Sequence, residues 1–135
     1  MSDIIIIDNE YISMSYLPDK KFVYHTTYKP VSGQILRDAL LAGLETLQKY
    51  GAHKWLSDER KNGPMTREDQ EWGRVNLNPR AVEIGWKYWA LVVPEQLIAA
   101  GSMAPAIEEY YELGMRMMVF SDVKEAIQWL DRFED

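Results

Sequence analysis

The feature that most constrains the fold is an almost continuous apolar run at residues 86–93, in which Lys87 is the only charged residue. Gly85 precedes the run and Pro94 follows it, so residues that interrupt regular structure bound it on both sides. A strand with one face in water alternates apolar and polar residues, whereas a strand covered by helices on both faces stays apolar along its length. The run therefore predicts an interior strand of a parallel sheet.

The first thirty residues predict extended structure. Residues 4–7 are four consecutive isoleucines, and apolar residues occupy every second position in residues 11–16 and 22–28. A period of two is typical of a half-buried strand. Because the turn-forming pair Pro18-Asp19 separates the two alternating segments, we expect them to form an antiparallel hairpin.

After residue 31 the spacing of apolar residues changes to three or four, which predicts an amphipathic helix. Ser32 is placed to cap the start of this helix, and Gly51 is placed to end it. The apolar stripe consists of Leu36, Leu40, Leu44 and Leu47.

Strands and helices alternate along the rest of the chain, which implies right-handed crossovers and a parallel sheet core. We therefore expect a single α/β domain over residues 1–135, with a mixed sheet that has a parallel core and an N-terminal antiparallel hairpin and is flanked by helices. Besides the run at 86–93, the further strands are expected at 53–57 and 116–120, and the further helices from Thr66 to about residue 76, at 79–84, 95–100 and 105–113, and after Asp122.

Charge and composition argue against several classes of function. The net charge is -6 and the 15 Lys and Arg residues are scattered, whereas nucleic acids and anionic membranes require a basic face. No stretch approaches the roughly 20 apolar residues that cross a bilayer. The start of the chain is acidic, unlike a signal peptide. Together with the absence of cysteine, these features lead us to expect a cytoplasmic protein.

No motif identifies a reaction, a metal or a cofactor. Neither His25 nor His53 has further ligands at the spacing of a zinc site. The chain also lacks a glycine-rich phosphate loop and a nucleophile elbow. A hydrolytic triad could in principle assemble from Ser57, His25 and Asp58, but their spacing does not favour one. We therefore expect no cofactor, no metal and no catalytic residues.

The most polar group at the end of a predicted strand is Asp58-Glu59-Arg60. Ligands of open α/β sheets bind at the carboxyl ends of strands. One of the two carboxylates could act as an acid or base if its pKa were raised. The alternative interpretation is a solvated turn with local ion pairs.

Five aromatic residues lie within one predicted strand–helix–strand segment. Alternation along the strand places Trp86 and Tyr88 on one face and Trp89 on the other. Packing in the core explains residues of this kind, and the functional alternative is a lined pocket or a protein interface. The five residues are Trp55, Trp72, Trp86, Tyr88 and Trp89.

Five short segments in the second half of the chain carry a family resemblance: His-Lys-Trp-Leu-Ser-Asp at 53–58, Glu-Asp-Gln-Glu-Trp at 68–72, Gly-Trp-Lys-Tyr-Trp-Ala at 85–90, Val-Phe-Ser-Asp at 119–122 and Ala-Ile-Gln-Trp-Leu at 126–130. Through them, roughly residues 50–131 resemble small bacterial STAS-like proteins of the SpoIIAA-like fold. These segments are patterns of packing and capping, so they are more specific for a fold than for an activity.

The resemblance implies a mixed sheet flanked by helices and favours interaction over catalysis. STAS domains act as anti-sigma-factor antagonists and as regulatory or ligand-sensing domains, and the related CRAL-TRIO domains bind lipids. Switching members are phosphorylated on a serine in the sequence Asp-Ser-x-Gly. Ser57 and Thr66 are the conceivable acceptors here, but neither lies in that sequence. Glu68 and Asp69 would also repel a phosphate at the start of the helix.

The leading hypothesis is a non-enzymatic, STAS-like regulatory or interaction module, monomeric or homodimeric, that binds a protein partner or a small apolar ligand. One alternative is a small enzyme that uses Asp58 or Glu59 as acid or base, and another is a subunit of a homo-oligomeric assembly. The residues expected to form the binding site are Trp55, Asp58, Glu59, Arg60 and Trp72.

Overall fold

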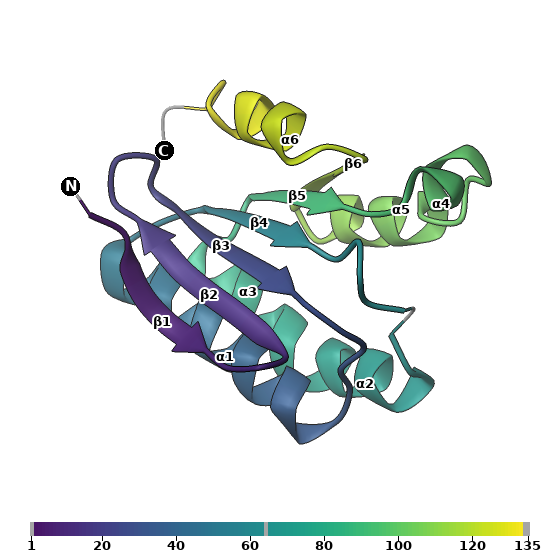
Figure 1. Cartoon of the computed structure of the whole chain (residues 1–135), viewed down its shortest axis with the longest axis horizontal. Coiled ribbons are helices and arrows are strands. Elements are labelled where there is room, and N and C mark those ends of the chain that lie inside the picture. Colours follow the sequence, from purple (N-terminus) through teal and green to yellow (C-terminus); the bar gives the residue numbers. More distant parts are fainter. Residues whose placement is uncertain (1, 64, 134–135) are drawn as a thin grey trace.

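A computed structural model describes residues 2–63 and 65–133 of the chain. Within these residues six strands form one mixed sheet, and their order across the sheet follows their order in the chain (Figure 1). The predicted α/β class is therefore confirmed, with an antiparallel amino-terminal part and a parallel remainder. The strands are β1 (Ile4–Asp8), β2 (Ile12–Leu17), β3 (Phe22–Thr27), β4 (Lys54–Asp58), β5 (Tyr88–Val92) and β6 (Arg116–Phe120).

Strands β1, β2 and β3 form the antiparallel part. β2 and β3 pair as a hairpin, as predicted, with Leu17 opposite Phe22 next to the turn. The register of β1 against β2 shifts between Ile5 and Ile7. Because this bulge inserts one residue, Ile6 and Ile7 both pack against the core, while Ile5 points outward and is 70% exposed. The bulge thus explains how four consecutive isoleucines fit a strand with one buried face.

In the described part of the chain, seven helical segments connect and cover the strands. α1 connects β3 to β4; α2, η1 and α3 connect β4 to β5; α4 and α5 connect β5 to β6; and α6 closes the chain. Their bounds are α1 (Gln34–Tyr50), α2 (Arg67–Trp72), η1 (Gly73–Leu77), α3 (Asn78–Ile84), α4 (Glu95–Ala99), α5 (Ala104–Glu112) and α6 (Val123–Leu130). No helix in the described part of the chain combines the length and the apolar character that a bilayer crossing requires.

The strand predicted from the apolar run lies inside the sheet. β5 pairs in parallel with β4 on one side and with β6 on the other. Ala90 and Val92 pack against α6, whereas Leu91 packs against α4 and α5 on the opposite face. The run is apolar throughout because helices cover both faces of this strand.

The helices divide unequally between the two faces. Residues of α1, η1 and α3 pack in one core cluster with β2, β3 and β4, and α4 and α5 lie against the same face at β5 and β6. On the other face α6 packs against β4, β5 and β6 (Figure 1). The structure thus has a thick helical layer on one side of the sheet and a single helix on the other.

Two local predictions are wrong. The N-cap of α1 is Gly33, not Ser32, and no side chain makes a capping hydrogen bond at the start of this helix. The helix that starts after Thr66 does not stop near residue 76, because it widens into the π-helical turn η1 and continues as α3. In this turn the backbone N–H of Asn78 donates to the carbonyl of Gly73. A helix that widens by one residue can therefore pass Pro79, which has no N–H to donate.

Candidate functional site

The candidate site lies where β3 and β4 end and the chain continues into residues 58–63 and 65–69, the last three of which begin α2. Three acidic residues of this segment, Asp58, Glu59 and Asp69, each bind side chains or backbone groups around them. We call the described residues of this segment, 58–63 and 65–69, the anchored loop. The sequence predicted a site here because ligands of open α/β sheets bind at strand ends.

Glu59 is the central anchor. Its Oε1 accepts hydrogen bonds from His25 Nε2 at 2.5 Å and from Thr27 Oγ1 at 3.2 Å, both on β3. Its Oε2 accepts from Asn62 Nδ2 at 2.9 Å, and the side-chain oxygen of Asn62 accepts from the backbone N–H of Val31 at 3.1 Å. Burial by itself raises the pKa of Glu59, whereas the hydrogen bonds from His25, Asn62 and Thr27 lower it, and this pKa lies below its ordinary value.

The proton of the His25 ring is placed by its neighbours. Trp55 Nε1 lies 2.9 Å from His25 Nδ1. An indole nitrogen can only donate, so Nδ1 must accept and the ring proton lies on Nε2, which donates to Glu59. His25 is 4% exposed. The contact with Glu59 is therefore a hydrogen bond from a neutral imidazole to a carboxylate, not a pair of opposite charges.

The arrangement of Ser57, His25 and Glu59 resembles a hydrolytic triad in composition but not in chemistry. Ser57 Oγ lies 3.4 Å from His25 Nδ1, whose lone pair already accepts from Trp55. The hydroxyl oxygen of Ser57 in turn accepts from Trp89 Nε1 at 2.9 Å, and the residue is 1% exposed. A buried hydroxyl next to an occupied acceptor cannot be activated as a nucleophile in this arrangement.

Asp58 faces the other side of the sheet from Ser57, as strand alternation requires. Its carboxylate binds the guanidinium of Arg60 through two contacts, Nε to Oδ1 at 2.9 Å and Nη2 to Oδ2 at 2.8 Å. Asp58 is buried, whereas 47% of the Arg60 side chain is exposed. The hydrogen bonds that Arg60 donates to the Asp58 carboxylate raise the pKa of Arg60. Asp58, which the sequence analysis considered as the third residue of a triad, thus binds Arg60, and the residue that binds His25 is Glu59.

Asp69 anchors the far end of the loop to α1. Its carboxylate accepts from the backbone N–H of Gly33 at 3.0 Å and from Arg37 Nε at 2.9 Å. Thr66 Oγ1 accepts from the backbone N–H of Asp69 at 3.1 Å and caps α2, as predicted. Burial raises the pKa of Asp69, but the hydrogen bonds from Gly33 and Arg37 outweigh it and lower the pKa overall. Asp69 also supplies the negative charge that the amino terminus of α1 favours.

The tryptophans of this region fill the interior. Trp55 is fully buried and stacks on Trp86 with ring centroids 4.5 Å apart. A Cβ atom placed on Gly43 of α1 would lie 2.0 Å from the Trp55 ring, so no side chain larger than hydrogen fits between them. Trp86 precedes β5 and packs against Trp89 at 5.0 Å. The prediction that Trp86 shares a face with Tyr88 is therefore wrong, since Tyr88 packs in the opposite core cluster.

The structure brings together three of the five predicted site residues. Asp58, Glu59 and Arg60 begin the anchored loop, whereas Trp55 lies in the core. Trp72 is the last residue of α2 and packs against the same core cluster, with the Arg37 guanidinium 5.5 Å from its ring centroid. The sequence did not predict that His25, Thr27 and Asn62 bind Glu59. It also did not predict that Asp69 binds Gly33 and Arg37. Within the described residues no group of three or more His, Cys, Asp and Glu side chains is placed to hold a metal ion.

Comparisons of the chain with protein-family models, with curated proteins and with solved structures found no match. The resemblance to STAS-like proteins therefore stays a prediction from the sequence.

Proposed function

We propose that this protein is a non-catalytic binding module that recognises a protein partner through the exposed surface of the anchored loop. The observation that supports this most is the attachment of an irregular loop at three carboxylates, Asp58, Glu59 and Asp69. Burial of a carboxylate is costly unless it is paired and hydrogen-bonded. A loop held in this way is ordered before a partner arrives, so less conformational entropy is lost on binding.

The exposed part of the loop has the features of a recognition surface. Arg60, Lys61 and Met65 are exposed, while the anchoring atoms lie beneath them. Residues that bind partners are concentrated on loops that a rigid scaffold positions, and arginine and methionine are enriched in protein interfaces. The proposal therefore assigns recognition to the loop surface and rigidity to the buried network.

The same network argues against the enzymatic alternative. His25 Nδ1 accepts from Trp55 and Nε2 donates to Glu59, so neither nitrogen is left for a substrate. The pKa of Glu59 is lowered, whereas a general acid or base that works near neutral pH needs a raised carboxyl pKa. We favour a protein partner over a small apolar ligand because Trp55 packs directly against α1.

The proposal agrees with what the STAS resemblance implies, namely interaction without catalysis. Of the two conceivable phosphorylation sites, Ser57 is 1% exposed and is out of reach of a kinase in the folded protein. Thr66 is exposed, but its hydroxyl caps α2 next to Glu68 and Asp69. A phosphate there would lie among like charges, so we propose recognition that does not depend on phosphorylation.

The proposal is tested by site-specific photo-crosslinking in cells of the source organism. The photoreactive amino acid replaces Lys61 in the loop and, as a matched control, Lys124 in α6, since both are exposed lysines. We expect a discrete adduct with one protein from position 61 and not from position 124. In a Glu59→Gln background, which loosens the loop, the adduct from position 61 is expected to weaken severalfold.

Two outcomes contradict the proposal. One is an adduct pattern that is the same from positions 61 and 124, or that does not respond to Glu59→Gln in a protein shown to be folded. The other is turnover of activated carboxylic or phosphate esters by the purified protein that disappears in Ser57→Ala, because a non-catalytic module has no activity to lose.

A further inference from the structure

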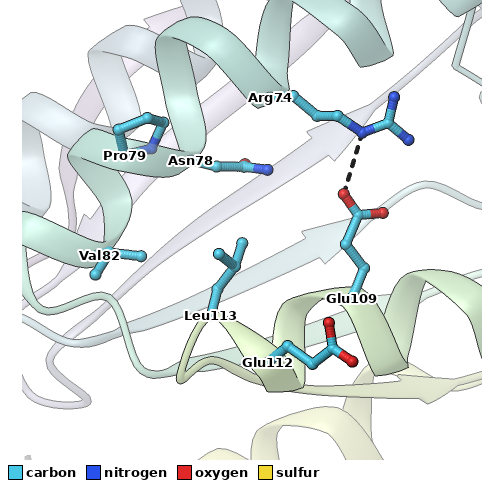
Figure 2. A pocket seen from close by; sticks show the side chains of 7 residues that line it. All are labelled: Arg74, Asn78, Pro79, Val82, Glu109, Glu112 and Leu113. Atoms are coloured by element: carbon cyan, nitrogen blue, oxygen red, sulfur yellow. Dashed lines mark hydrogen bonds and ion pairs between the residues drawn. The ribbon is translucent and has the colours of Figure 1, made fainter.

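A groove with an apolar floor runs between α3 and α5, and none of the residues that line it belongs to the anchored loop. It is open to solvent and has a volume of about 270 Å³. Figure 2 shows Pro79 and Val82 on the α3 side and Leu113, Glu109 and Glu112 on the α5 side, with the Asn78 side chain between them. The full lining consists of Arg74, Asn78, Pro79, Val82, Glu109, Glu112 and Leu113.

The apolar residues along this groove are unusually exposed. Val82 is 48% exposed and Leu113 is 38% exposed, and on the adjoining turn η1 Val75 is 64% exposed. Val75, Pro79 and Val82 follow one another at intervals of four and three residues, so they form a stripe along one side of the helical segment. A contiguous apolar surface with polar edges marks a place where another molecule binds.

The charged residues around the groove are mainly acidic. α5 contains Glu108, Glu109 and Glu112 and no basic residue. Arg74 on the opposite side forms ion pairs with Glu109 at 3.1 Å and with Glu71 at 3.3 Å, so one positive charge is shared by two glutamates. Glu112 lies next to Leu113 at the edge of the groove (Figure 2). The groove therefore combines an apolar floor with a wall of excess negative charge.

We infer that this groove binds an amphipathic helix of another protein, with apolar side chains against Val82 and Leu113 and basic side chains toward Glu112. Helices bind to grooves of this kind through apolar residues spaced three and four apart, and complementary charge sets orientation and partner choice. A second copy of this chain fits less well, because a symmetric contact would bring the acidic α5 walls of both copies together.

The inference is tested with two synthetic peptides and the full-length protein. Both peptides carry leucines on one helical face; the first has lysines on the other face and the second has glutamates at the same positions. Binding is measured by calorimetry, and the site is located by amide chemical shifts of the labelled protein. We expect the lysine peptide to bind, with affinity falling as salt increases, and to perturb amides mainly within residues 74–82 and 109–113.

Two charge reversals decide whether the groove itself is responsible. Glu112→Lys alters the edge of the groove, and Glu125→Lys makes the same change in net charge on α6, which packs on the other face of the sheet. We expect Glu112→Lys to weaken the lysine peptide by about fivefold or more and Glu125→Lys to have much less effect. Val82→Ser is expected to weaken it as well without a change in charge.

The inference is overturned by equal binding of the two peptides, by equal effects of the two charge reversals, or by shifts that lie elsewhere on the protein. Self-association that Val82→Ser abolishes would overturn it in favour of a second copy as the occupant. These peptides and variants test the groove, whereas the crosslink from position 61 tests the anchored loop, so a failure here leaves the proposed function standing.

Discussion

The imidazole of His25 shows how single residues fix this structure. A buried ring with one donor and one acceptor must find a partner for each, and Glu59 and Trp55 supply them at 2.5 and 2.9 Å. The assignment follows from the chemistry of the indole, which has no lone pair to offer. A ring with free nitrogens would suit catalysis, whereas this ring connects β3 to the anchored loop.

The tautomer is directly measurable. Long-range nitrogen–proton correlation spectra of labelled protein at neutral pH are expected to show His25 neutral, with its proton on Nε2. Trp55→Phe removes the donor to Nδ1 and is expected to lower the free energy of unfolding by about 1–3 kcal/mol beyond the effect of the smaller ring. Trp129→Phe, in the other core cluster, is the control for ring size. A proton on Nδ1, or equal losses in both variants, contradicts the assignment.

The buried carboxylates make stability depend on pH. The folded-state pKa values of Glu59 and Asp69 lie below their ordinary values, so their contribution is present above the unfolded pKa of about 4 and is lost as pH falls through the folded pKa. We expect Glu59→Gln and Asp69→Asn to lower stability at pH 7 by about 1–3 kcal/mol each. Denaturant unfolding between pH 7 and pH 3 should show these deficits shrinking in acid. Deficits that are constant over this range are inconsistent with ionised anchors.

At the scale of elements, the segments that the sequence predicted well are those with a pattern of apolar residues within the segment itself. The apolar run around β5, the alternation of β2 and β3 and the stripe of α1 each depend on neighbouring residues, and all three elements form. The contact at the start of α1 was not predictable in this way, because the backbone N–H of Gly33 donates to Asp69, 36 residues away in the chain. The faces of Trp86 and Tyr88 were misassigned because β5 starts two residues later than the apolar run.

The candidate site likewise has a part that the local sequence predicts and a part that it does not. Asp58, Glu59 and Arg60 follow a buried strand directly, so their position at a sheet edge could be predicted. The contact between His25 and Glu59 joins residues 34 apart in the chain, and no periodicity reports which histidine meets which carboxylate. Such a pairing emerges only from the parallel register of β3 and β4, in which His25 lies opposite Ser57.

The contact between α1 and the sheet gives a prediction at this scale. In Gly43→Ala the new methyl group would meet the Trp55 ring at 2.0 Å, so either the helix or the tryptophan must move. We expect a loss of about 1–3 kcal/mol despite the higher helix propensity of alanine. Gly73→Ala is the matched control, because nothing lies within 4 Å of the position of its added Cβ. A stabilised Gly43→Ala variant would contradict the close packing of α1 on the Trp55 ring.

At the scale of the whole molecule, the hydrogen-bonded core and the exposed surfaces that we assign to recognition are different parts of the structure. The sheet and the helices of its thicker side hold a core whose polar groups are hydrogen-bonded, and within the described residues no buried side-chain nitrogen or oxygen atom lacks a partner. The surfaces that we assign to recognition lie outside this core, at the anchored loop and at the groove between α3 and α5.

The central claim is that the buried carboxylates hold the loop in a fixed conformation before any partner binds. Nitrogen-15 relaxation of the backbone amides at residues 59–63 and 65–69 measures this directly. The account predicts order parameters near 0.85, typical of rigid backbone, in the native protein, and values below about 0.6 over part of the loop in folded Glu59→Gln or Asp69→Asn. A loop that is already mobile in the native protein, or that stays rigid in both variants, contradicts the claim.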